Sequence, residues 1–99
     1  MRAFYIDTNE RLREIFRDHC NLSGEQFEEI NGRFIYLVCD IQEEEPQEVI
    51  EDKVSELHVI FEFLYNTKEL TIGEYNDLCN LANEIQNAGE KLAMGLAVT

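Results

Sequence analysis

The chain has 99 residues and a mass of 11.6 kDa, and 21 Asp and Glu against 8 Lys and Arg give it a formal charge of −13. A chain of this size can bury one hydrophobic core, which excludes a multidomain enzyme. The negative charge argues against direct contact with nucleic acids or anionic membranes, because both attract basic surfaces. Hydrophobic residues make up 44% of the chain, too many for a disordered protein. We therefore expect residues 1–99 to form a single acidic domain.

The cysteines and the apolar runs indicate the cellular compartment in which we expect the protein. Cys20, Cys39 and Cys79 are odd in number, widely spaced and without a Cys-x-x-Cys pair. This pattern is typical of buried free thiols in a reducing cytoplasm rather than of a disulfide framework or a metal site. The longest apolar runs, such as residues 34–39, are far too short to span a bilayer, and no secretory leader begins the chain. We expect a cytoplasmic protein without a membrane segment, cofactor or metal.

The first predicted helix runs from about Thr8 to Cys20. Asp7-Thr8-Asn9-Glu10 fits a capping box, in which the first side chain accepts from the backbone and the fourth reaches back. The apolar face of this helix also contains His19, so this histidine is predicted to be a core residue rather than a ligand. The residues of this face are Leu12, Ile15, Phe16 and His19.

The second predicted helix covers residues 24–42 and begins after another capping box, Ser23-Gly24-Glu25-Gln26. Its apolar residues fall within an arc of roughly 100°, as expected for a helix that faces a core. They are Phe27, Ile30, Phe34, Leu37, Val38 and Ile41. Residues 33–41 are also rich in β-branched and aromatic side chains, and Asn31-Gly32 could end a helix before them. An α+β alternative would therefore pair a strand at 33–41 with a strand at 2–6.

Two more helices are predicted in the second half of the chain. One starts at Pro46, because proline suits a first helical position, and runs to about Asn66. The other follows the capping box Thr71-Ile72-Gly73-Glu74 and continues into the nineties. Their apolar stripes are Ile50, Val54, Leu57, Phe61 and Leu64 in the first, and Tyr75, Leu78, Leu81, Ala82, Ile85 and Leu92 in the second. Because the connections are short, we expect an all-α, antiparallel four-helix bundle.

Charge is concentrated around the predicted turn between the second and third helices. Residues 40–56 contain eight acids and one lysine, a formal charge of −7 in 17 residues. We call these acids the acidic strip: Asp40, Glu43, Glu44, Glu45, Glu48, Glu51, Asp52 and Glu56. They serve either solubility and the helix dipole, or docking to a basic protein. In the docking interpretation, carboxylates along a rigid helix imitate the phosphates of a nucleic acid.

The predicted third helix also carries an apolar pair opposite its core stripe. Val59 and Phe63 follow Glu48, Asp52 and Glu56 at one residue per turn. Either a neighbouring helix covers this pair, or it forms a hydrophobic anchor beside the acidic strip, as many interfaces do. Homodimerisation would use the same residues.

These observations favour a protein-binding function. The first hypothesis is an inhibitor or regulator that occupies the basic nucleic-acid-binding surface of a partner through the acidic strip and the apolar pair. In size and acidity the chain is similar to small phage-borne inhibitors of restriction or CRISPR enzymes, and this resemblance implies a DNA mimic. The alternative is a small acidic chaperone or dimeric adaptor that holds an apolar segment.

An enzyme remains a further alternative. Glu44-Glu45-x-x-Glu48, followed after 25 intervening residues by Glu74-Tyr75-Asn76-Asp77, resembles in outline the EExxE…ExxD pattern of the all-α nucleotide pyrophosphatases. The resemblance implies carboxylates that converge on magnesium and activate water against a pyrophosphate. The match departs from the family at Pro46, which lies within the first motif, and Glu74 is needed as the capping partner of Thr71.

Overall fold

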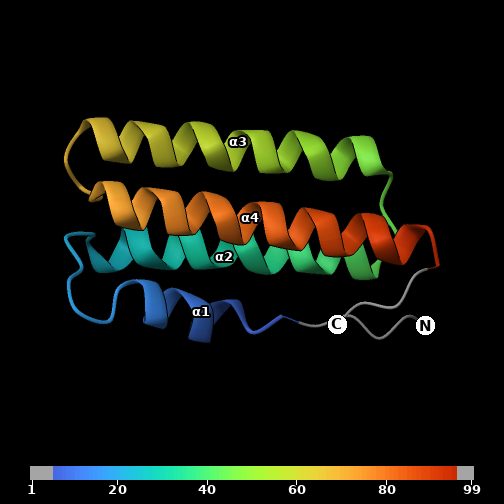
Figure 1. The fold of residues 1–99 in the computed structure, drawn as a ribbon, viewed down its shortest axis with the longest axis horizontal. Coiled ribbons are helices and arrows are strands. Elements are labelled where there is room, and N and C mark those ends of the chain that lie inside the picture. Colours follow the sequence, from blue (N-terminus) through green and yellow to red (C-terminus); the bar gives the residue numbers. More distant parts are fainter. Residues whose placement is uncertain (1–5, 96–99) are drawn as a thin grey trace.

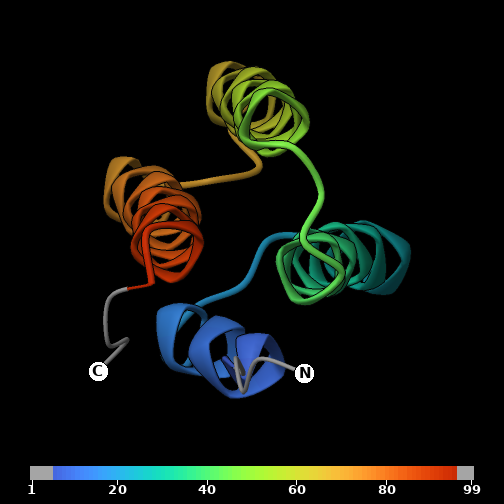
Figure 2. The same cartoon turned by 90° about the vertical axis from the view of Figure 1, so that its right-hand side faces the viewer.

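The computed structural model describes residues 6–95 and contains four α-helices in this range. They are α1 (Thr8–Ile15), α2 (Gly24–Gln42), α3 (Gln47–Asn66) and α4 (Ile72–Ala93). Consecutive helices run antiparallel (Figure 1), and the end-on view places them in the order α1, α2, α3, α4 around a central core (Figure 2). The predicted all-α four-helix bundle is confirmed.

Local capping chemistry sets three of the four helix starts. Ser23 and Gln26 form a reciprocal capping box before α2, with N···O distances of 2.9 and 3.1 Å. Thr71 and Glu74 form the same box before α4, at 2.8 and 3.1 Å. At α1, the Asp7 carboxylate accepts from the Glu10 amide at 3.0 Å. These bonds satisfy amides that have no partner within the helix.

The α3 start differs slightly from its prediction. Pro46 stands at the N-cap, one residue before the helix, and no side chain caps the first turn. Its carbonyl instead accepts from the amides of Val49 and Ile50 at 2.9 and 3.3 Å.

The strand alternative for residues 33–41 is wrong, because the whole segment lies in α2. Phe34, Leu37 and Val38 are buried, whereas Ile35 and Tyr36 are 45% and 69% exposed. This is helical periodicity and not the alternation of a strand. Of the proposed partner strand at 2–6, residues 2–5 lie outside the described residues, and Ile6 is not in a strand.

The first helix is shorter than predicted. It ends at Ile15 with Phe16 as C-cap, rather than continuing to Cys20. The Phe16 ring packs edge-on against Phe27 of α2, with 5.9 Å between centroids, so the chain leaves the helical path as it crosses to α2. His19 therefore lies in the connection and is 60% exposed at its side chain, which corrects its prediction as a core residue.

The core lies between all four helices, and α4 contacts each of the other three. At its centre, Phe34 of α2 and Phe61 of α3 are fully buried and stack with ring centroids 5.8 Å apart. Gly89 allows a close approach between α4 and α2, because a Cβ there would lie 2.9 Å from Ile41 Cδ1. Both α2 and α3 thus contribute buried aromatic residues to the core, which anchors the surface that they share.

The cysteines are free thiols, but burial differs among them. Cys20 is exposed, and Cys39 and Cys79 are half-buried, so the prediction of three buried thiols is wrong for Cys20. Burial raises the pKa of the Cys79 thiol.

Candidate protein-binding surface

The outer face of α3 carries an exposed row that includes half of the predicted contact residues. Glu48, Asp52 and Glu56 are exposed and follow one another at one residue per turn. The row continues with Val59 and Phe63, which are 67% and 63% exposed. The apolar pair is therefore uncovered, and the interpretation that a neighbouring helix buries it is wrong. One helix face thus joins carboxylates at its start to apolar side chains at its end.

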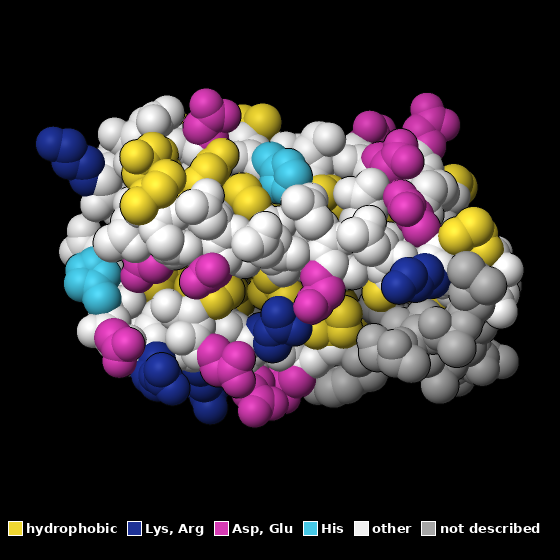
Figure 3. Space-filling model, viewed as in Figure 1, with side chains coloured by type: hydrophobic (Ala, Val, Ile, Leu, Met, Phe, Trp, Pro, Cys, Tyr) yellow, Lys and Arg dark blue, Asp and Glu magenta, His cyan; other side chains and the backbone are white. Residues whose placement is uncertain are grey.

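The distribution of charge is visible over the surface of the molecule. Figure 3 shows acidic side chains gathered over the N-terminal part of α3, and hydrophobic side chains over its C-terminal end and the start of α4. The exposed hydrophobic residues of that end include Phe63, Tyr65 and Ile72. Most of the acidic side chains of α3 therefore lie toward its N-terminal end, and the exposed apolar side chains lie toward its C-terminal end, where Glu62 is also exposed.

The turn between α2 and α3 adds three carboxylates to the same end. Glu43, Glu44 and Glu45 are all exposed. The Glu44 amide donates to Ile41 O at 3.1 Å and the Glu45 amide donates to Asp40 O at 3.0 Å, so the turn is held by backbone hydrogen bonds. Glu44 has a φ of 61°, a left-handed conformation that is uncommon outside glycine. Glu51, the remaining residue of the acidic strip in α3, is also exposed.

Asp40 differs from the rest of the acidic strip. Its side chain is only 15% exposed and forms an ion pair and hydrogen bond with Lys53, which links α2 to α3. The hydrogen bond to Asp40 raises the pKa of Lys53. The charge of Asp40 is thus matched within the bundle, so this residue serves the α2–α3 contact more than an outside partner.

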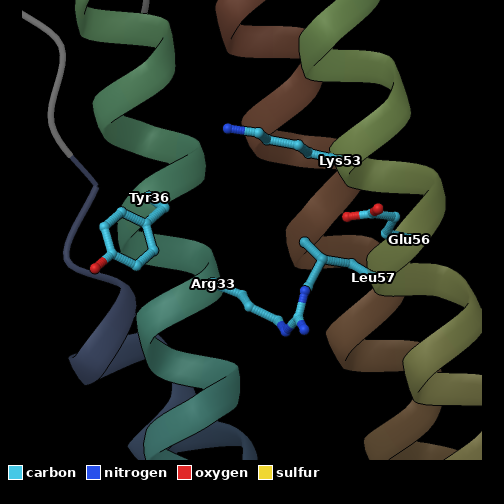
Figure 4. Close-up of a pocket in the computed structure, with 5 residues that line it drawn as sticks. All are labelled: Arg33, Tyr36, Lys53, Glu56 and Leu57. Atoms are coloured by element: carbon cyan, nitrogen blue, oxygen red, sulfur yellow. The ribbon is translucent and has the colours of Figure 1, made fainter.

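A groove between α2 and α3 runs beside the exposed row, and the sequence analysis did not predict it. It consists of two adjoining cavities of about 180 and 440 Å³. The smaller is lined by Arg33, Tyr36, Lys53, Glu56 and Leu57 (Figure 4), and the larger by Arg33, Asp52, Ser55, Glu56, Val59 and Ile60. Arg33 and Glu56 line both. We call the two together the α2–α3 groove.

The carboxylates of the pyrophosphatase-like pattern are not brought together. Glu44 and Glu45 lie in the turn before α3 and Glu48 in its first turn, whereas Glu74 and Asp77 lie in α4, beyond the other end of this 20-residue helix of about 30 Å. Glu74 is buried and caps Thr71, and its second oxygen lies 3.3 Å from His19 Nδ1. Within residues 6–95, no group of three or more His, Cys, Asp or Glu side chains is arranged to hold a metal ion.

Comparison with known proteins found no matching family model and no significant match to a curated protein or a solved structure. In the described part of the chain, no helix has both the length and the apolar character needed to cross a membrane. Function is therefore inferred from the surface itself.

Proposed function

We propose that this protein is an acidic binding module that inhibits or regulates a partner by occupying its basic nucleic-acid-binding surface. The observation that carries the proposal is the exposed acidic row of Glu48, Asp52 and Glu56 on one face of α3. The three carboxylates of the preceding turn extend the negative charge at the same end of the bundle.

The physical basis is electrostatic and geometric. Successive carboxylates on the row are four residues, or about 6 Å, apart along the axis. They are held on a helix whose other face is anchored in the core by Ile50, Val54 and Leu57. Such a row offers preorganised anions to the Lys and Arg groups that otherwise bind phosphates. The net charge of −13 would also speed the encounter with a basic protein.

The test begins with recovery of the partner from native extract at low and high salt, followed by binding and competition measurements on the purified pair. We expect affinity to fall steeply with salt, and a nucleic acid bound by the partner to be displaced. The triple variant Glu48→Lys, Asp52→Lys and Glu56→Lys should lose binding by more than about 100-fold, since buried charge pairs cost several kcal/mol when broken.

The matched control is Glu14→Lys, Glu28→Lys and Asp77→Lys, which changes the net charge equally at exposed positions on other helices. This control should retain most of the affinity if the α3 row is the contact surface. Equal losses in both variants would mean that only the overall charge matters. No competition with nucleic acid would reject the proposed function.

The exposed apolar pair favours a second candidate, a chaperone or dimeric adaptor that holds an apolar segment. Val59 and Phe63 are both more than 60% exposed, which is unusual for large apolar side chains at adjacent turns. In that case Phe63→Asp should abolish binding, whereas added salt should leave the affinity unchanged. Binding that weakens with salt and survives Phe63→Asp would exclude the adaptor.

A further inference from the structure

The α2–α3 groove combines apolar and acidic walls in one concavity. In the larger cavity, Val59 and Ile60 form the apolar wall, and Glu56 and Asp52 lie one and two turns before Val59, respectively, on the same helix. Val59 and both acids are exposed, whereas Ile60 is half-buried and packs against the core. The volume of about 440 Å³ is sufficient for a large aliphatic or aromatic side chain.

On the α2 side of the groove, a buried hydrogen-bond donor has no partner. Arg33 extends from α2 toward Leu57 of α3 (Figure 4) and lines both cavities. Its Nε is buried and makes no hydrogen bond with any described residue, and its Nη2 makes only a long bond of 3.4 Å to Glu29. Buried polar groups normally have partners. The groove therefore contains an unused donor as well as uncovered apolar surface.

We infer that the α2–α3 groove receives an apolar side chain from a basic amphipathic helix of the partner, while Lys or Arg residues of that helix pair with Asp52 and Glu56. This inference rests on the proposed function, because the cations belong to the same basic partner. It adds that the partner presents a helix in which an apolar residue lies among the basic ones. If the protein imitated phosphates alone, the partner would need only the basic residues.

The choice of a basic helix follows from spacing and charge. The contact residues of α3 recur once per turn, and a partner helix lying alongside presents its own residues with the same period. Lys53 pairs with Asp40, whereas Arg33 makes one long bond to Glu29 and its Nε has no partner among the described residues. Asp52 and Glu56 are both exposed and supply the negative charge that attracts the cations of the partner helix. A second copy of this chain fits poorly, because each copy brings a charge of −13.

The test uses two synthetic peptides of about five helical turns with identical composition, Leu and Lys. In one the leucines form a single helical face, and in the other they are scattered around the helix. Titration calorimetry at low salt should give at least tenfold tighter binding for the amphipathic isomer. The variant Ser55→Phe, which fills the groove without changing charge, should remove that preference, because Ser55 is exposed and lines the larger cavity.

The control for this variant is Asn83→Phe, an equally apolar substitution at an exposed position of α4. It should leave the preference intact. Equal binding of the two isomers, or an unaltered preference in Ser55→Phe, would overturn the groove inference. Sedimentation that shows a dimer dissociated by Ser55→Phe would assign the groove to a second copy and also overturn it. The proposed function is decided separately, by competition between the protein and nucleic acid for the partner.

Discussion

Gly32 and Gly89 both lie inside long helices, but their surroundings differ. A Cβ at Gly32 of α2 would meet nothing within 4 Å, whereas a Cβ at Gly89 of α4 would lie 2.9 Å from Ile41 Cδ1. Glycine inside a helix costs about 0.5–1 kcal/mol relative to alanine. At Gly32 the missing side chain allows no closer packing, whereas at Gly89 it permits the contact between α2 and α4.

We therefore expect Gly32→Ala to raise the free energy of unfolding by about 0.5–1 kcal/mol. Gly89→Ala should show no such gain, because Ile41 must shift to accommodate the new methyl group. Urea denaturation of both variants beside the parent protein checks this pair. A gain at Gly89 equal to that at Gly32 would show that the α2–α4 contact is loose.

At the scale of elements, the capping box before α4 connects two parts of the fold. Thr71 and Glu74 exchange hydrogen bonds at the start of the helix, and Glu74 also lies beside His19 in the α1–α2 connection. Glu74 is 6% exposed, so a helix start and an interhelical contact share one buried carboxylate.

Thr71→Ala should lower the free energy of unfolding by about 1 kcal/mol, because the Glu74 amide loses its acceptor. Thr71→Ser keeps the hydroxyl and should remain within a few tenths of a kcal/mol of the parent. Chemical denaturation followed by circular dichroism measures both. Equal stability of the alanine and serine variants would contradict a role for the cap.

The bounds of a helix could be predicted where neighbouring residues in the sequence determine them. They could not be predicted where a contact with another helix is involved. The starts of α2 and α4 follow from side chains within four residues, so they could be predicted. The end of α1 was not predicted: Phe16 is its C-cap and packs against Phe27 of the neighbouring helix α2, a contact that the local sequence does not indicate. The β-prone segment at 33–41 is helical because Phe34 packs on Phe61, and tertiary packing outweighs a propensity of this size.

For the whole molecule, the excess of carboxylates makes stability depend on ionic strength. Glu48, Asp52 and Glu56 are like charges at i,i+4 spacing, each pair costing about 0.2–0.5 kcal/mol. Salt weakens this repulsion between carboxylates, because the Debye length falls from about 30 Å at 0.01 M to about 8 Å at 0.15 M salt.

Raising sodium chloride over this range should therefore increase Tm by about 5 °C, since about 1 kcal/mol corresponds to 4–8 °C in a domain of this size. The neutral variant Glu48→Gln, Asp52→Asn and Glu56→Gln should have a higher Tm at low salt and a smaller salt response. Scanning calorimetry at several salt concentrations checks both. A Tm independent of salt would mean that repulsion within the acidic row is negligible.

From the sequence alone it was possible to predict the four-helix bundle, the bounds of three helices to within a residue or two, and the acidic row on α3. These features could be predicted because periodicity and capping act over short distances. It could also place Val59 and Phe63 opposite the core stripe. Only the tertiary structure decided that this pair is uncovered, that Asp40 is paired with Lys53, and that a groove lies beside Arg33. The physical reason is that helical phase gives the direction of a side chain about its own axis. What that side chain meets depends on which helices pack on either side.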